Sequence, residues 1–217
     1  MEQTFWLEHW AADKIGFHRT ETNPLLMRHW ASMGVDPGSR VFVPLCGKSL
    51  DMVWLADVGH DIVGVELSPL AIRDFFSEQG MSPSSTQPDG FLRLQAGAIT
   101  LFSGDFFELS PRQVQPVGAV YDRGALIALP EDMRKLYAAT LAELAPAPIL
   151  LITTNYDQSE MPGPPFAVTP TEVRSLYEDR YEIQVLEGPV DIMDQEPKFG
   201  ERGVTSLEAT VFRLTPR

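Results

Sequence analysis

The segment of residues 40–66 constrains the fold more than any other part of the chain. It predicts a short buried strand over Val41–Leu45, a tight turn at Gly47 and, after a helix, a second buried strand over Ile62–Val65 that ends on Glu66. Such a unit opens a nucleotide-binding α/β sheet. An acid 19 residues after the turn glycine (66 − 47) lies where a ribose diol binds in these folds. Because a carboxylate can accept a hydrogen bond from each ribose hydroxyl, the segment predicts an adenosine-type cofactor.

The residues of the turn separate the classes of cofactor. A dinucleotide site needs G-x-G-x-x-G, because the backbone must approach a pyrophosphate closely, but this turn contains a single glycine, Gly47. The tripeptide Gly47-Lys48-Ser49 imitates a phosphate loop, yet that pattern requires a glycine five residues before Gly47, where Phe42 stands. Both phosphate-binding interpretations therefore fail. S-adenosylmethionine, which has a ribose and an adenine but no phosphate, is the cofactor that remains.

The charge balance narrows the partners of the chain. The 217 residues include 17 Lys and Arg against 30 Asp and Glu, a formal net charge of −13. This balance repels phosphate backbones and anionic lipid, so we expect neither a nucleic-acid partner nor a membrane surface. The single cysteine, Cys46, rules out an intrachain disulfide and suits a reducing compartment. Without a recognisable secretion signal, the chain is expected to be cytoplasmic, and nothing in it demands more than a monomer.

Apolar runs along the chain predict a mostly parallel sheet with helices on both faces. Strand-like runs alternate with helical patterns, as in strand–helix–strand units. The five strand-like runs are Val41–Leu45, Ile62–Val65, Ile99–Phe102, Val117–Tyr121 and Ile149–Thr154. The helical patterns are Leu50–Val58, Pro69–Glu78 and Glu131–Leu144.

The C-terminal part of the chain departs from this alternation. After the fifth strand a Pro-rich loop, Met161–Pro165, precedes two alternating strand runs, Tyr181–Leu186 and Thr205–Leu214. A long polar loop without a long helical pattern joins these runs, so we expect antiparallel neighbours. Five parallel strands completed by an antiparallel pair are the usual layout of Rossmann-like, class I S-adenosylmethionine-dependent methyltransferases. Whether the Pro-rich loop closes over a substrate stays open at this point.

The N-terminal part of the chain predicts helices. Trp6 and Trp10 lie one turn apart on one helix face, and Asn23-Pro24 starts a second helix. We expect a single domain over residues 1–217, in which residues 1–38 form a helical cover over the active site.

Four motifs carry a resemblance to a known enzyme family. They are WAADKIGFH, FVPLCGKSLDM, DIVGVELS and VYDRGALIALP. With these motifs the chain resembles the thiopurine S-methyltransferase family, in its bacterial form, over nearly its whole length. The resemblance implies S-adenosylmethionine as the methyl donor and S-methylation of aromatic and heterocyclic thiols. Bacterial members also methylate selenium and tellurium species, so a small thiol or chalcogen compound is the expected acceptor.

The resemblance assigns the cofactor to residues at the ends of the first two strands. Glu66 is expected to hold the ribose hydroxyls, and the main chain at Leu45 and Gly47 to meet the methionine part. The Trp10 ring matches a family position that touches the cofactor, where it can cover the sulfonium by cation–π attraction. Packing within the N-terminal helix is the alternative for Trp10. Cys46 is expected to be a small buried neighbour, since no histidine is placed to activate its thiol.

Residues after the third and fourth strands complete the expected cofactor site. Asp105 and Phe106 follow the third strand, where methyltransferases reach the adenine, although Asp105 is an equally good candidate for a helix N-cap. Arg123 follows the fourth strand, and the resemblance favours a contact at the cofactor site. It would clamp the cofactor carboxylate or orient an anionic substrate, with Asp122 as its structural support; a plain salt bridge is the alternative.

Candidate substrate contacts come from less specific positions. Phe17 matches a family position that lines the substrate pocket, so it is a candidate for stacking on a flat heterocycle. His18 is a candidate general base, with an ordinary surface histidine as the more common outcome. Arg202, between the last two strands, is a weaker candidate for substrate contact. The four histidines show no metal-ligand spacing, and no metal is expected.

The expected reaction is an in-line displacement, in which a sulfur nucleophile attacks the cofactor methyl group within a dry pocket. Charge disappears during this reaction, so positioning and desolvation can carry catalysis without a strong base, with Arg123 contributing. Two alternatives stay open. One is a binding module that holds the cofactor without acting on thiols, and the other is a nicotinamide-dependent oxidoreductase, which the missing G-x-G disfavours.

Overall fold

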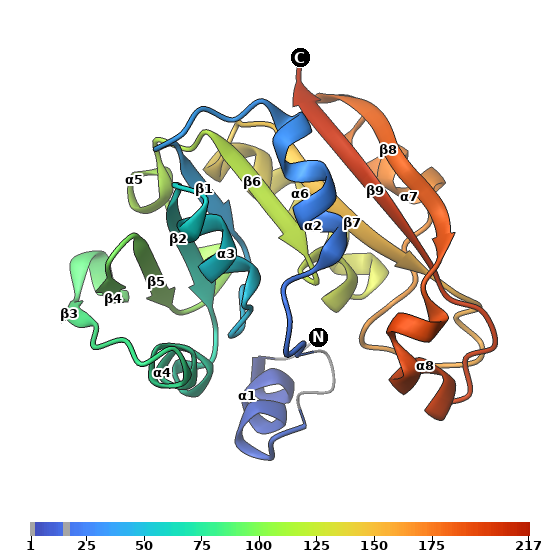
Figure 1. The fold of residues 1–217 in the computed structure, drawn as a ribbon, viewed down its shortest axis with the longest axis horizontal. Helices are drawn as coiled ribbons and strands as arrows, with labels where there is room; N and C mark the ends of the chain where they lie inside the picture. Colours follow the sequence, from blue (N-terminus) through green and yellow to red (C-terminus); the bar gives the residue numbers. More distant parts are fainter. Residues whose placement is uncertain (1–2, 15–17) are drawn as a thin grey trace.

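The computed structural model describes residues 3–14 and 18–217 and contains one mixed sheet (Figure 1). Within this part of the chain the sheet has nine strands in the order β3-β4-β5-β2-β1-β6-β7-β9-β8. The strands are β1 (Arg40–Val43), β2 (Asp61–Glu66), β3 (Ser84–Thr86), β4 (Leu92–Ala96), β5 (Ile99–Ser103), β6 (Ala119–Arg123), β7 (Ile149–Asn155), β8 (Tyr181–Asp191) and β9 (Glu208–Pro216).

The centre of the sheet is parallel, as the apolar runs predict. β5, β2, β1, β6 and β7 pair in parallel registers, while β7–β9 and β8–β9 are antiparallel. The five parallel strands are largely buried, which explains why their sequences are continuous apolar runs. The predicted class I methyltransferase architecture, with its antiparallel C-terminal pair, is therefore confirmed.

Helices cover both faces of the sheet. The α-helices of the described residues are α1 (Gln3–Ala11), α2 (Pro24–His29), α3 (Asp51–Asp57), α4 (Pro69–Glu78), α5 (Pro111–Val114), α6 (Glu131–Leu144), α7 (Pro170–Tyr177) and α8 (Pro197–Glu201). Several of them begin at a proline that follows a polar cap: the side chains of Asn23, Ser68 and Thr169 each accept a hydrogen bond from a first-turn amide. Among the helices of the described residues, none is long and apolar enough to cross a bilayer.

Side-chain alternation along the strands divides the core into two layers. On β1, Val41 and Val43 belong to a buried cluster with side chains of α2, α3 and α4. Phe42, between them, belongs to a second cluster with side chains of α6 and α7. Successive strand residues point to opposite faces, so each of the five parallel strands anchors both layers, and the carboxyl ends of these five strands lie at one edge.

The fourth parallel strand lies two residues later than its apolar pattern predicts. β6 ends on Arg123, so Asp122 and Arg123 belong to the strand instead of following it. Asp122 is completely buried, and its Oδ2 accepts a hydrogen bond from the Tyr137 hydroxyl at 2.7 Å. The predicted role of Asp122 as the support of Arg123 is therefore wrong, because this carboxylate pairs with α6.

Two further differences concern segments with little apolar signal. β3 and β4 form an antiparallel pair at the edge next to β5, where no strand was predicted. The connection from β8 to β9 holds a 3-10 turn, η5 (Met193–Gln195), and α8, where only a polar loop was expected. In the terminal pair, β8 begins at Tyr181 as predicted but runs on to Asp191, and β9 begins at Glu208 instead of Thr205.

Candidate functional site

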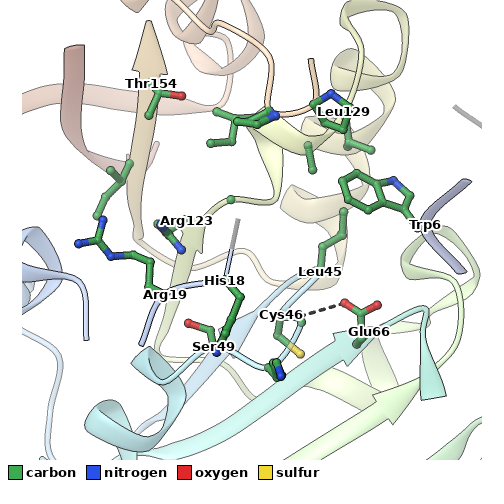
Figure 2. Close-up of a pocket in the computed structure, with 18 of the residues that line it drawn as sticks. Trp6, His18, Arg19, Leu45, Cys46, Ser49, Glu66, Arg123, Leu129 and Thr154 are labelled. Atoms are coloured by element: carbon green, nitrogen blue, oxygen red, sulfur yellow. Dashed lines mark hydrogen bonds between the residues drawn. The ribbon is translucent and has the colours of Figure 1, made fainter. Parts of the chain in front are cut away.

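A cavity of about 570 Å³ lies at the carboxyl edge of the parallel strands. Its walls come from the residues that follow β1, β2, β5 and β6, from α1 and the segment after it, and from the β8–β9 connection. The sheet order reverses direction between β1 and β6, so the crevice at this edge opens between their diverging connections. Figure 2 shows Glu66 on one side of this cavity and Arg19 and Arg123 on the other.

Glu66 ends β2 with its carboxylate held by the backbone. Its Oε2 accepts a hydrogen bond from the Gly47 amide at 2.9 Å, and its Oε1 accepts one from the Ser68 amide at 2.8 Å. Burial raises the pKa of Glu66 above 4.5, while the amides of Ser68 and Gly47 act in the opposite direction. A carboxylate offers about four lone-pair sites, so the two amides leave acceptor capacity on both oxygens. These free lone pairs are the acceptors that the two hydroxyls of a vicinal diol require.

The turn after β1 has an unusual backbone. Leu45 has φ = 44° and Gly47 has φ = 54°, so two of three consecutive residues are left-handed. Such a conformation is strained for a leucine. A side chain at Gly47 would also meet the Trp10 ring, since a built Cβ lies 3.3 Å from Trp10 Cζ2. Glycine therefore lets the indole of α1 lie directly on the turn whose Gly47 amide binds Glu66.

Asp105 and Phe106 lie after β5 on the Glu66 side of the site. Asp105 caps a 3-10 turn, η3 (Phe106–Glu108), by accepting the Phe107 amide at 2.9 Å, which bears out the N-cap alternative. Its Oδ2 also accepts a hydrogen bond from Gln3 Nε2 at 2.8 Å, so it joins α1 to the sheet edge. Phe106 lines the cavity, although the residue itself is almost fully buried.

The surroundings of Cys46 and Lys48 support neither a nucleophilic thiol nor a phosphate-binding lysine. Burial, and then the charge of Glu66, raises the pKa of the Cys46 thiol well above its usual value, so no reactive thiolate forms there. Lys48 Nζ binds Glu78 Oε1 at 2.6 Å, and the residue is nearly buried. The ammonium that would serve a phosphate loop is thus paired with a carboxylate of α4.

Arg123 projects from the end of β6 toward the opposite wall of the cavity. Its Nη2 lies 3.7 Å from Glu196 Oε1, and the same oxygen binds Arg19 Nη1. The salt-bridge alternative for Arg123 is therefore realised, with Glu196 as the partner. Lys198 and Arg202 also line the cavity, so cationic side chains gather in a protein whose net charge is −13.

His18 also lines the cavity, so it is not the ordinary surface histidine that was the alternative to a general base. Burial lowers the pKa of His18 below 6.5, and the Lys48 ammonium lowers it further, so the imidazole is neutral at pH 7. Lys198 and Arg123 act in the same direction, which places these cations near the ring. Phe17 lies outside the described residues.

The Pro-rich loop reaches the cavity through Gly163, Pro164 and Pro165. Tyr156 holds this loop, since its hydroxyl donates to the Pro165 carbonyl at 2.6 Å. Arg202 Nη1 donates to the Pro164 carbonyl at 3.2 Å, so this candidate lies at the loop.

Arg19, Glu196 and Thr154 are cavity residues that sequence reasoning missed. Arg19 and Glu196 come from irregular segments 177 residues apart, and only the folded chain brings them together. Thr154, labelled in Figure 2, lies near the end of the predicted strand and carried no motif.

Comparisons with known proteins identify the family. The thiopurine S-methyltransferase family model matches residues 1–217. The chain is 47% identical over 219 residues to the thiopurine S-methyltransferase of Azotobacter vinelandii, with 100% of both chains covered. It is 49% identical over 216 residues to that of Pseudomonas paraeruginosa, with 99% of both covered.

Solved structures show the same fold at low identity. The chain superposes with a TM-score of 0.61 on the Burkholderia thailandensis 1,6-didemethyltoxoflavin-N1-methyltransferase with bound 1,6-didemethyltoxoflavin and S-adenosylhomocysteine. The identity is 15%, and 98% of this chain and 87% of that chain are covered. The full-length family match decides the assignment: the chain belongs to the thiopurine S-methyltransferase family, whose enzymes transfer a methyl group from S-adenosylmethionine.

Proposed function

We propose that this methyltransferase acts on the sulfur of aromatic and heterocyclic thiols. The proposal rests on two cationic side chains, Arg19 and Arg123, which lie across a cavity of about 570 Å³ from Glu66 and form what we call its cationic wall. Heteroaromatic thiols ionise readily, and a guanidinium favours an anion beside it. The names of the full-length relatives support the same acceptor class. Selenium and tellurium nucleophiles are proposed as further acceptors, because small anions suit the same wall.

The contacts around Glu66 support a donor end for S-adenosylmethionine. Glu66 would accept hydrogen bonds from the ribose hydroxyls through the lone pairs that Gly47 and Ser68 leave open. The turn at Leu45 and Gly47, under the Trp10 ring, would hold the methionine part. Asp105 and Phe106 are assigned to the adenine. We also propose residues 1–38 as the cover of the site, supported by the bond from Gln3 to Asp105.

Catalysis is proposed to rest on placement. When bound, S-adenosylmethionine supplies an electrophilic methyl group on a positively charged sulfur. Arg123 would keep the acceptor sulfur anionic and in line with that methyl group, which can contribute several orders of magnitude to a rate. The neutral imidazole of His18 can accept the proton of a thiol that arrives protonated. α1 and the loop at Pro164 would exclude water, and a dry site favours a reaction in which charges cancel.

Three measurements test the proposal. Calorimetric titration with S-adenosylhomocysteine should show one site per chain in the micromolar range, and the E66A variant should bind far more weakly. Mass spectrometry should then detect methylated product from 6-mercaptopurine and S-adenosylmethionine. Binding without transfer to any thiol, selenite or tellurite would support a binding module instead. A change in NADH fluorescence on mixing would favour an oxidoreductase.

A further inference from the structure

Glu196 joins three distant segments at the acceptor end of the cavity. It stands between η5 and α8 in the β8–β9 connection, and its Oε1 contacts Arg19, which follows α1, and Arg123, which ends β6. The three side chains are each about one-fifth exposed, at 19%, 22% and 21%. All three residues line the cavity. The contact is therefore part of the wall that an acceptor meets.

The two arginines are held in different ways. Arg19 donates a hydrogen bond to Glu196 Oε1. Arg123 Nη2 lies 3.7 Å from the same oxygen, which is an ion-pair distance but too long for a hydrogen bond. Glu196 therefore attracts the Arg123 guanidinium without engaging its N–H donors at this contact. Within residues 3–14 and 18–217 no hydrogen bond from these donors is found, so they can serve a ligand in the cavity.

The charges of the cluster give Glu196 a second effect. Two guanidinium groups that converge on one point repel each other, and their charges sum to +2. Glu196 reduces this sum to +1, so both arginines can stay at the wall. Without the carboxylate, the attraction for an anion would persist or rise, but nothing in the cluster would fix where Arg123 points.

We infer that Glu196 is a positioning residue for the methyl acceptor: it orients Arg123 and, through Arg19, holds residues 18–23 against the cavity. This inference rests on the proposed function. An ordinary surface ion pair contributes little, but this one is partly shielded and sits where the orientation of a reactant is decided. Small misplacements of a reactant can lower a rate by about 100-fold.

The E196Q variant tests the inference, because it removes the charge and keeps the size. We expect kcat with 6-mercaptopurine to fall by about tenfold or more, since orientation is lost. KM should not rise, because the positive charge of the wall is retained. The Kd for S-adenosylhomocysteine should stay within about twofold, since Glu66 is untouched. E196D keeps the charge and should recover most of kcat.

The control is E201Q, which removes a carboxylate from the exposed α8 position of Glu201. Glu201 is not among the described residues that line the cavity, so this variant should behave as wild type. Hydrogen exchange adds a readout that needs no acceptor. Amides of residues 18–23 should exchange faster in E196Q than in E201Q, because the contact with Arg19 loses its ionic part and is weakened.

Each outcome decides the inference. An unchanged kcat in E196Q would overturn it, and so would a parallel loss of kcat, cofactor affinity and thermal stability, which indicates a structural role. A wild-type enzyme that binds S-adenosylhomocysteine but methylates no thiol would refute the proposed acceptor class. Hydrogen exchange at residues 18–23 would then be the deciding measurement. Equal rates in E196Q and E201Q would overturn the role of Glu196, and faster exchange in E196Q would support it.

Discussion

Replacing Glu66 with alanine should weaken cofactor binding and spare the fold. The carboxylate accepts the Gly47 and Ser68 amides, so the change removes two backbone hydrogen bonds as well as the proposed ribose contacts. Hydrogen bonds to a charged group contribute about 1.5–3 kcal/mol each, which gives roughly 3–6 kcal/mol for two ribose hydroxyls. Water that enters the vacated space offsets part of this loss. We expect a net loss of about 2–4 kcal/mol, or roughly 30- to 1000-fold in Kd.

Calorimetric titration with S-adenosylhomocysteine measures this loss directly. The matched control is D61A, which removes a carboxylate from the exposed start of the same strand and should bind as wild type. E66Q should fall between wild type and E66A, because its amide keeps one acceptor oxygen but sets an N–H group against a backbone donor. Thermal melting confirms that each variant is folded. A folded E66A protein with unchanged affinity would refute the assignment of Glu66 to the ribose.

Three further predictions concern Trp10, Arg123 and Asp122. W10A should weaken S-adenosylmethionine binding by about 1–2 kcal/mol, because the ring that lies on the turn at Gly47 is lost, and W10F should retain part of it; equal calorimetric affinities would contradict the contact. R123A should lower kcat/KM for a thiol by roughly 10- to 100-fold without changing affinity for S-adenosylhomocysteine, and R123K should not restore it, because an ammonium lacks the planar fork. Burial raises the pKa of Asp122 from 3.8 to about 6. The folded state therefore binds the carboxyl proton of Asp122 more tightly than the unfolded state does, so this group stabilises the fold fully below about pH 4, and that stabilisation is lost as pH rises to about 6. The free energy of unfolding should fall by about 3 kcal/mol over this range, and urea-denaturation curves of D122N between pH 4 and 7 should lack this fall. The same pH dependence in D122N and wild type would show that Asp122 titrates normally.

The central sheet was predictable because burial on both faces makes its strands apolar. The limits of that signal appear where burial and polarity disagree. The predicted fourth strand stopped at Tyr121 because a charged pair follows, but Asp122 is buried and bonded to Tyr137. β3 was missed because all three of its residues, Ser84–Thr86, are exposed and polar, so pairing with β4 alone makes it a strand.

The residues of the candidate site also fall into those that the sequence predicts and those that it does not. Glu66 and the turn at Gly47 were found because they follow strands at a characteristic spacing, and both lie at the cavity. Glu196 and Arg19 were missed because neither belongs to a periodic element. Their role depends on a contact across 177 residues of sequence, which no local pattern encodes.

The two ends of the cavity come largely from different parts of the chain, which under the proposed function would let the donor and acceptor sites change separately. The end at Glu66 is built mainly by connections within the parallel sheet, whereas the end at Arg123 borrows Arg19 and Glu196 from outside it. Exchanging residues 18–23 together with the β8–β9 connection between relatives would transplant one wall and leave the other intact. Directed evolution toward new methyl acceptors can therefore begin with libraries that vary these two segments. Affinity for S-adenosylhomocysteine should stay constant across such libraries.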